Sequence, residues 1–242
     1  MDALARRLAG AGFVAPEEEA AELRAAGGDL EALVARRLTG EPLAWITGTT
    51  TFCGLRLAVH PGVYVPRWQT EAIAERAAAR LPATGTAVDA CCGCGAVAAV
   101  LRARRPAARV LATDADPRAV ANARANGVEA LAGDLLAPLP AGLRADVVVA
   151  VVPYVPTGEL ALLHRDALAF EPRDAYDGGA DGLVLARRLV DQAREVLRPG
   201  GALVLELGGR QSRALPFDGF TGARVLRDED GDVRGVEATR SG

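Results

Sequence analysis

Three aspartates and a glycine-rich turn are the residues of this chain best suited to binding a small ligand. Asp89 ends a predicted strand and begins the turn, Asp114 ends the next strand, and Asp134 follows the third. Gly93 and Gly95 let backbone N–H groups approach a ligand, and the helix that follows adds a favourable field. A carboxylate at Asp114 can accept both hydroxyls of a ribose, and Asp134 can reach the adenine amine. The three carboxylates predict a site for an adenosine-containing ligand.

A second group of candidate site residues ends the apolar strand that precedes Val152. The segment Val152-Pro153-Tyr154-Val155-Pro156 cannot readily continue a strand or a helix, so the backbone must turn out of the sheet there. Ligands bind at this carboxyl end of the strands in an open parallel sheet. We therefore expect four residues at the reacting end of the site: Val151, Val152, Pro153 and Tyr154.

Cys91, Cys92 and Cys94 crowd the glycine turn, which raises a metal site as an alternative. Zinc needs four ligands at suitable spacing, and no second cysteine pair or nearby histidine completes the set. We predict that no metal binds and that these small side chains fill tight positions in the turn. Asp116, followed by Pro117, is interpreted as a helix N-cap.

Strands and helices are predicted to alternate from Thr70 onward, which favours an α/β fold with a parallel sheet and right-handed crossovers. The expected strands are Thr86–Ala90, Arg109–Thr113, Val128–Leu131, Asp146–Val151 and Ala202–Leu207. The expected helices are Glu71–Arg80, Ala96–Arg104, Pro117–Asn126 and Leu183–Leu197. Asp230-Gly231 predicts a C-terminal hairpin between Arg224–Arg227 and Val233–Ala238. A mostly parallel, seven-stranded sheet ending in an antiparallel hairpin resembles the class I methyltransferase (Rossmann-like) fold.

The region before the sheet is predicted to form two further parts. Residues 1–39 carry apolar side chains at helical spacing and are expected to be a small helical domain. Residues 40–69 are rich in Gly, Thr and Pro, and two short strand patterns flank Cys53-Gly54, as expected of a linker with a β-ribbon. Trp45 and Trp68 are interpreted as packing residues of this ribbon. Residues 70–242 are expected to form the ligand-binding domain.

Composition narrows the possible partners. The 242 residues carry a formal charge of −3, and all 28 basic residues are arginines scattered along the chain. Nucleic acid is therefore not expected as a primary partner, and the absence of lysine excludes a Schiff base and a P-loop lysine. No apolar run reaches the length of a membrane span, and the N-terminus lacks the order of a signal peptide. We expect a cytoplasmic protein.

Three linear segments carry a resemblance to a known family. They are Arg37–Gly48, Val65–Glu71 (Val-Pro-Arg-Trp-Gln-Thr-Glu), and Glu171–Arg173 together with Asp177–Leu183. From Arg36 onward the chain resembles the HemK/PrmC family, the release-factor glutamine methyltransferases. The resemblance implies S-adenosylmethionine as cofactor and in-line attack of an acceptor atom on its methyl group. It also implies a methyl acceptor that is either a protein resembling a release factor or a small molecule.

The chain departs from this family at the acceptor loop. The family reads Asn-Pro-Pro-Tyr where this chain has Val151, Val152, Pro153 and Tyr154. In the family, the Asn side chain and the next backbone carbonyl receive the two N–H groups of a glutamine amide. Val151 cannot accept a hydrogen bond, so one N–H would stay unpaired at a cost of roughly 1–3 kcal/mol. We therefore expect a different, less polar acceptor. The alternative is that the chain still methylates glutamine.

The glycine turn also departs from the family pattern. The family has Gly-Thr-Gly-Ser/Thr-Gly where residues 91–95 of this chain are Cys-Cys-Gly-Cys-Gly. A bulky residue often follows the third acidic position, where this chain has Leu135. The resemblance implies the following cofactor-binding residues: Asp89, Cys91, Cys92, Gly93, Cys94, Gly95, Asp114, Asp134, Leu135 and Val151. Two function classes remain open, a methyltransferase and a non-catalytic relative that binds the cofactor and acts as an interaction module. The retained acidic residues and glycines favour the enzyme.

Overall fold

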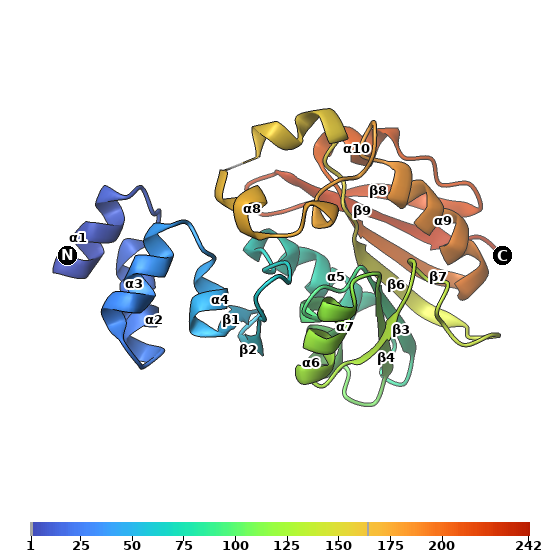
Figure 1. The fold of residues 1–242 in the computed structure, drawn as a ribbon. Coiled ribbons are helices and arrows are strands. Elements are labelled where there is room, and N and C mark those ends of the chain that lie inside the picture. The colour runs from blue at the N-terminus through green and yellow to red at the C-terminus, as the bar shows by residue number, and fades with distance from the viewer. Residues whose placement is uncertain (1, 164) are drawn as a thin grey trace.

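The computed structural model describes residues 2–163 and 165–242, and Figure 1 shows a helical N-terminal part beside a sheet covered by helices. The N-terminal helices are α1 (Ala3–Gly10), α2 (Pro16–Ala25) and α3 (Leu30–Leu38). Asp2 caps α1 and Asp29 caps α3, because each carboxylate accepts backbone N–H groups of the first turn. Leu8, Leu23 and Val34 form a separate small core between these helices.

A short helix that the sequence did not indicate, α4 (Leu43–Thr47), connects this small core to the rest of the molecule. Its Ile46 packs with the N-terminal helices, while its Trp45 packs in the main core and donates from Nε1 to the carbonyl of Val63 at 2.9 Å. Trp45 is thus confirmed as a packing residue. The predicted ribbon follows as β1 (Thr49–Phe52) paired antiparallel with β2 (Leu55–Ala58). The division at residues 39 and 69 stays a prediction.

The central sheet confirms the predicted fold class. Its seven strands run in the order β5-β4-β3-β6-β7-β9-β8. They are β3 (Thr86–Ala90), β4 (Arg109–Asp114), β5 (Glu129–Ala132), β6 (Ala145–Val151), β7 (Leu197–Glu206), β8 (Phe220–Arg227) and β9 (Val233–Arg240). Strands β3 to β7 pair in parallel, and β9 lies antiparallel between β7 and β8. The chain returns to the middle of the sheet at β6, which creates a topological switch point between β3 and β6.

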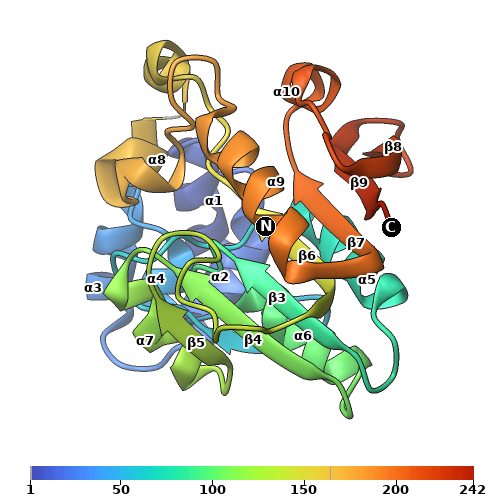
Figure 2. The same cartoon turned by 90° about the vertical axis from the view of Figure 1, so that its right-hand side faces the viewer.

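Helices cover both faces of the sheet (Figures 1 and 2). On one face lie α5 (Glu71–Arg80), α6 (Ala96–Arg104) and α7 (Pro117–Ala125), and on the other lies α9 (Val184–Val196). Successive residues of β6 alternate between them: Val147 and Val149 pack with α5 to α7, and Val148 and Ala150 pack with α9. Burial on both faces explains why this strand is apolar from Val147 to Val151.

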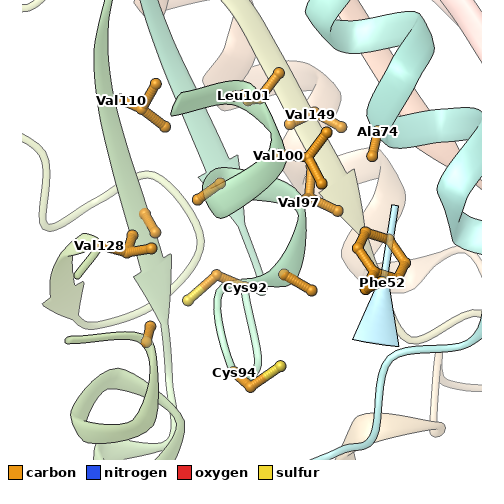
Figure 3. Packing of buried hydrophobic residues seen from close by; sticks show 14 of the residues in the cluster. Phe52, Ala74, Cys92, Cys94, Val97, Val100, Leu101, Val110, Val128 and Val149 are labelled. Atoms are coloured by element: carbon orange, nitrogen blue, oxygen red, sulfur yellow. The ribbon is translucent and has the colours of Figure 1, made fainter. Parts of the chain in front are cut away.

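The core between the sheet and α6 also holds the ribbon in place. Figure 3 shows Phe52 of β1 beside Val97 of α6, in the same buried cluster as Val100 of α6 and Val149 of β6. Phe52 is only 1% exposed, so the ribbon is part of the main core. None of the helices that the structure describes has both the length and the apolar character needed to span a bilayer.

Several short elements and strand ends differ from the sequence expectations. Helices α8 (Arg165–Phe170) and α10 (Gly209–Ala214) were not expected, nor were the 3-10 helices Trp68–Thr70, Thr157–Leu162 and Arg173–Ala175. Strand β7 begins at Leu197 because that residue pairs with Ala145, ahead of the regular register that starts at Ala202. Strand β8 begins at Phe220, which pairs with Arg240 ahead of an irregularity between Thr221 and Arg224. These boundaries depend on partners distant in sequence, which local patterns do not contain.

We predict that Gly235→Ala strongly destabilises the protein. A methyl group at Gly235 would overlap the carbonyl oxygen of Leu205 on the paired strand β7, and backbone atoms cannot move aside cheaply. The free energy of unfolding, measured by urea denaturation, should fall by about 3 kcal/mol. Gly158→Ala is the control, because no atom lies within 4 Å of the added methyl. Equal stabilities for the two variants would contradict this account of the β7–β9 pairing.

Candidate functional site

A cavity of about 670 Å³ opens at the carboxyl ends of β3, β4 and β6, beside the switch point. It brings together the predicted residues from four separate segments of the chain. The predicted residues that line it are Asp89, Cys91, Cys92, Gly93, Cys94, Asp114, Asp134, Leu135, Val151, Val152, Pro153 and Tyr154. Gly95 lies just outside the lining. Their roles toward cofactor and acceptor stay predictions.

Glycine suits positions 93 and 95 of the turn for two different structural reasons. A methyl group built on Gly93 would meet only the carbonyl oxygen of Tyr64, at 3.9 Å, so it would project into the open cavity. A methyl group on Gly95 would lie 2.9 Å from Cβ of Ala123 on α7. Gly93 therefore leaves the turn backbone accessible to a ligand, whereas Gly95 allows the start of α6 to pack against α7.

Asp114 is held in place by the backbone on both sides of the cavity. One carboxylate oxygen accepts from N–H of Gly93 at 2.9 Å, and the other accepts from N–H of Asp116 at 2.9 Å. Burial raises the pKa of Asp114, and the two N–H groups oppose that shift. The carboxylate retains acceptor capacity for ribose hydroxyls. Asp116 is confirmed as an N-cap, because it accepts from N–H of Arg118 at 2.8 Å.

Asp89 is the most deeply buried acid of the site, with 1% of its surface exposed. Its carboxyl accepts from the N–H of Ala98 in the first turn of α6 at 3.0 Å. Burial raises its pKa to about 8, the Ala98 N–H opposes this shift, and the nearby Asp114 adds to it. A positively charged ligand group would favour the ionised form of Asp89. The chemistry of this end of the cavity thus fits a cationic amino group.

Asp134 already has a partner. Its carboxylate forms an ion pair with Arg188 on α9, which the sequence did not indicate. The pair is exposed, so an adenine amine would share the carboxylate with the guanidinium. Leu135 follows with a positive φ of 48° and is 5% exposed, and it forms part of the apolar lining next to the carboxylate.

The cysteines of the turn behave as small buried side chains. Cys92 and Cys94 are 8% and 2% exposed, and Figure 3 shows their sulfur atoms pointing in different directions. Burial raises the pKa of all three thiols, that of Cys94 to about 12, so a thiolate is disfavoured at neutral pH. Within the described residues, no group of three or more His, Cys, Asp or Glu side chains is arranged to hold a metal. Absence of a metal stays a prediction.

The acceptor end of the cavity is apolar and aromatic. Val151 is half-buried against the core on the α5 face, and Val152 is buried on the opposite face. The hydroxyl of Tyr154 points to Glu206 of β7, with its oxygen 3.5 Å from Oε1. Two further tyrosines that sequence reasoning missed, Tyr64 and Tyr176, also line the cavity. Their ring centroids lie 5.5 Å apart in an edge-to-face arrangement, and with Tyr154 they account for every tyrosine of the chain.

Two of the segments that carried the sequence resemblance, Val65–Glu71 and Glu171–Arg173, meet beside this end of the cavity. Glu171 is 4% exposed, accepts from the N–H of Val65 at 2.8 Å and forms an ion pair with Arg67. The hydroxyl of Tyr176 also donates to Glu171. Tyr64 directly precedes the Val65–Glu71 segment, which was the available signal for it. The prediction that Trp68 is a packing residue was wrong: its ring is 65% exposed beneath the guanidinium of Arg234, because it starts a surface 3-10 helix.

The Asp177–Leu183 segment shapes the acceptor loop. The N–H of Val155 donates to the carbonyl of Tyr176 at 2.9 Å, and the N–H of Gly178 donates to the carbonyl of Val155 at 2.8 Å. A methyl group on Gly178 would lie 2.6 Å from the carbonyl oxygen of Pro153, and one on Gly182 would overlap the carbonyl of Tyr154. Close backbone contact therefore requires glycine at both positions and fixes the path of residues 153–155.

The known proteins to which this chain is similar are methyltransferases. The family described as "Methyltransferase small domain" matches residues 55–146. The release factor glutamine methyltransferase of Geobacter sulfurreducens is 40% identical over 214 residues, which are 84% of this chain and 75% of that protein. The same enzyme of Moorella thermoacetica is 43% identical over 209 residues, 82% of this chain and 72% of that protein. A solved methyltransferase from Pyrococcus furiosus has a TM-score of 0.55 at 18% identity, covering 86% of this chain and 97% of that one, a likeness of fold.

We predict that Asp114→Asn weakens binding of S-adenosylmethionine by tens of fold. The substitution removes the charge that strengthens hydrogen bonds from ribose hydroxyls, each worth about 1.5–3 kcal/mol at most. Calorimetric titration of the cofactor measures the effect. Asp191→Asn is the control, since its carboxylate on α9 is 69% exposed and pairs with Arg194 outside the cavity. An unchanged dissociation constant for the Asp114 variant would remove the ribose assignment.

We predict that ionisation of Asp89 destabilises the ligand-free protein as the pH rises. Its pKa is about 8 in the folded state and about 3.9 in an unfolded chain. The folded state binds the extra proton between these values, so the stabilisation is fully present below pH 4 and is lost as the pH passes 8. The melting temperature of the wild type should fall across this window relative to that of Asp89→Asn. If the melting temperatures of the two proteins change with pH in the same way, the pKa of Asp89 is not raised in the folded protein.

Proposed function

Because this chain belongs to the release factor glutamine methyltransferase family, we propose that it methylates an acceptor held between Val151 and Tyr154, and that this acceptor is less polar than a glutamine amide. The chain is an S-adenosylmethionine-dependent methyltransferase of the class I fold. Bound S-adenosylmethionine supplies a methyl group on a positively charged sulfur. The question that remains is which acceptor atom this pocket positions.

The charges of the cavity suit a cationic cofactor. Its lining includes Asp89, Asp114 and Asp134, and Arg118 is the only basic residue among its described lining residues. Arg118 is neutralised by Asp116, to which its guanidinium donates at 2.7 Å. A surplus of carboxylates raises the local concentration of positively charged ligands and favours their binding. These side chains support catalysis over the alternative of a non-catalytic interaction module.

The proposed acceptor depends on the apolar side chain at position 151. Val151 stands where the family has an asparagine, and its apolar side chain lines the cavity while packing against the core. The carbonyl of Val152 remains as a hydrogen-bond acceptor of the loop. Methyl transfer to a neutral atom mostly requires positioning and electrostatic stabilisation, and an apolar wall serves positioning when the acceptor is itself apolar. The aromatic rings of Tyr64, Tyr154 and Tyr176 extend that wall.

A glutamine of a release factor is the second candidate acceptor. The relatives at about 40% identity are named for that activity, and the similarity covers most of both chains. The two candidates differ in what they need from position 151, since a glutamine amide has two N–H groups to place and one loop acceptor is missing. A methyl-transfer assay with labelled cofactor, run against a release factor and against a small-molecule extract of the source cell, separates them.

We predict that Val151→Asn lowers transfer to the native acceptor and raises any trace activity on glutamine amides. An amide buried against an apolar acceptor stays unpaired at a cost of roughly 1–3 kcal/mol, which is about a ten- to hundredfold loss of rate. The rate constants for both acceptors are measured with labelled cofactor. Val14→Asn is the control, because Val14 is 99% exposed and lies outside the cavity.

One result would contradict the proposal of a less polar acceptor. Suppose the wild type methylates a release-factor glutamine at a typical enzymatic rate, on the order of one per second. If Val151→Asn then changes nothing, the substitution is merely tolerated and the proposal of a less polar acceptor fails.

A further inference from the structure

Glu206 is a buried carboxylate directly beside Val151. In the parallel pairing of β6 with β7, Val151 lies opposite Glu206 and Val149 lies opposite Val204. Val149 and Val204 both pack in the core on the α5 side, and side chains two residues apart on a strand share a face. Glu206 therefore lies on the same face as Val151, at the end of the strand where the cavity opens.

One oxygen of this carboxylate has no hydrogen-bond partner among the described residues. Glu206 is 7% exposed, and its Oε2 is one of two buried side-chain N or O atoms without a hydrogen bond among the described residues. Its Oε1 accepts from the Tyr154 hydroxyl at 3.5 Å. An unpaired buried acceptor is destabilising and is rare in proteins unless it has a functional use. The charged and titratable groups acting on Glu206 are Tyr64, Tyr154 and Arg234.

Tyr154 connects Glu206 to the cavity. Thr70, Val151 and Tyr154 line the cavity, and Glu206 lies behind them. Because the Tyr154 hydroxyl gives its hydrogen to Glu206, its oxygen still has a lone pair to accept a hydrogen bond from a ligand. A ligand N–H that reaches the Tyr154 oxygen would thus find a hydrogen-bond acceptor next to the apolar wall of the cavity.

Resting on the proposed function, we propose that Tyr154 and Glu206 form a proton relay that serves a weakly basic acceptor nitrogen carrying hydrogen. Tyr154 receives one N–H of the acceptor and the carbonyl of Val152 orients another. The acceptor class is an aromatic amine, which is less polar than a glutamine amide. The apolar and aromatic wall of the cavity favours binding of such a ring.

The relay balances the charges of the reaction. The nitrogen lone pair forms the N–C bond to the methyl carbon while the C–S bond breaks and its electron pair stays on sulfur. The nitrogen becomes positively charged and gives its proton to Tyr154, whose own proton passes to Glu206. The products are a neutral methylated nitrogen, a neutral sulfur and a neutral carboxylic acid. An aliphatic amine would keep its proton, because its conjugate acid is far weaker than a carboxylic acid.

Glu206 is suited to receive a proton. Burial raises its pKa, and this outweighs the lowering by Thr70, Tyr154 and Arg234. A carboxylate with a raised pKa is a stronger base than an exposed glutamate. The relay requires the ionised form of Glu206. The rate of methyl transfer should therefore fall as the pH is lowered, and this fall should begin at a pH above the ordinary pKa of a glutamate.

The experiment compares Glu206→Gln and Tyr154→Phe with the wild type. The acceptors are a release factor, benzamide and aniline as weakly basic nitrogens, and benzylamine as a strongly basic one. We expect wild-type transfer to aniline to exceed transfer to the release factor and to benzamide, with none to benzylamine. Each variant should lower kcat roughly a hundredfold, with the acceptor KM and cofactor affinity changed less than about threefold. Glu195→Gln, an exposed residue of α9, is the matched control and should keep the wild-type rate.

A second measurement does not depend on activity. Carbon NMR titration of the Glu206 carboxyl in the ligand-free protein should give a raised pKa in the wild type. Tyr154→Phe should raise it further, because the hydroxyl that stabilises the carboxylate is gone. This titration decides the matter if Glu206→Gln does not fold.

The outcomes separate the two proposals. No transfer by the wild type to any of these acceptors or to the cell extract, with the cofactor bound, overturns the proposed function and the relay together. Wild-type transfer that both variants retain overturns the relay alone. An ordinary pKa for Glu206, or one unchanged in Tyr154→Phe, also overturns the relay.

Discussion

The parallel pairing of β6 between β3 and β7 is the constraint on which the site depends. It places the carboxyl ends of three strands side by side, so that the glycine turn after β3, the acceptor loop after β6 and Glu206 at the end of β7 share one edge. Because each of these strands is buried on both faces, its register cannot slip without exposing apolar side chains. The stability of the core thereby determines the geometry of the reacting groups.

Segments outside the sheet complete the cavity through a small number of buried polar contacts. Glu171 joins the segment before α5 to the segment before α9, because it binds both the N–H of Val65 and the side chain of Arg67. Gly178 and Gly182 then let the acceptor loop pass close to the backbone that follows Tyr176. Removing one member of such a contact leaves a buried charge or an overlap, so these positions tolerate little change.

The two ends of the cavity differ in chemistry. Acidic side chains dominate where the cofactor is expected, and burial raises the pKa values of Asp89 and Asp114. Apolar and aromatic side chains dominate at Val151, with Glu206 as the buried acid behind them. Ionisation of a buried carboxyl group is costly when the group is alone and becomes favourable when a cation lies beside it. Binding of a cationic cofactor is therefore coupled to the ionisation of these acids.

The amino-acid sequence by itself determined the alternation of strands and helices, the glycine turn, the acidic residues after three strands and the valine at position 151. Local periodicity and turn residues encode the strands, helices and turns, and the cavity contains almost all of the site residues that these patterns and the family resemblance together predicted. Tertiary structure alone decided that Tyr64 and Tyr176 join the lining, that Arg188 pairs with Asp134, and that Glu206 lies beside Val151. These contacts join residues from about 50 to more than 100 positions apart, and their geometry follows from strand register and helix packing, which no local pattern records.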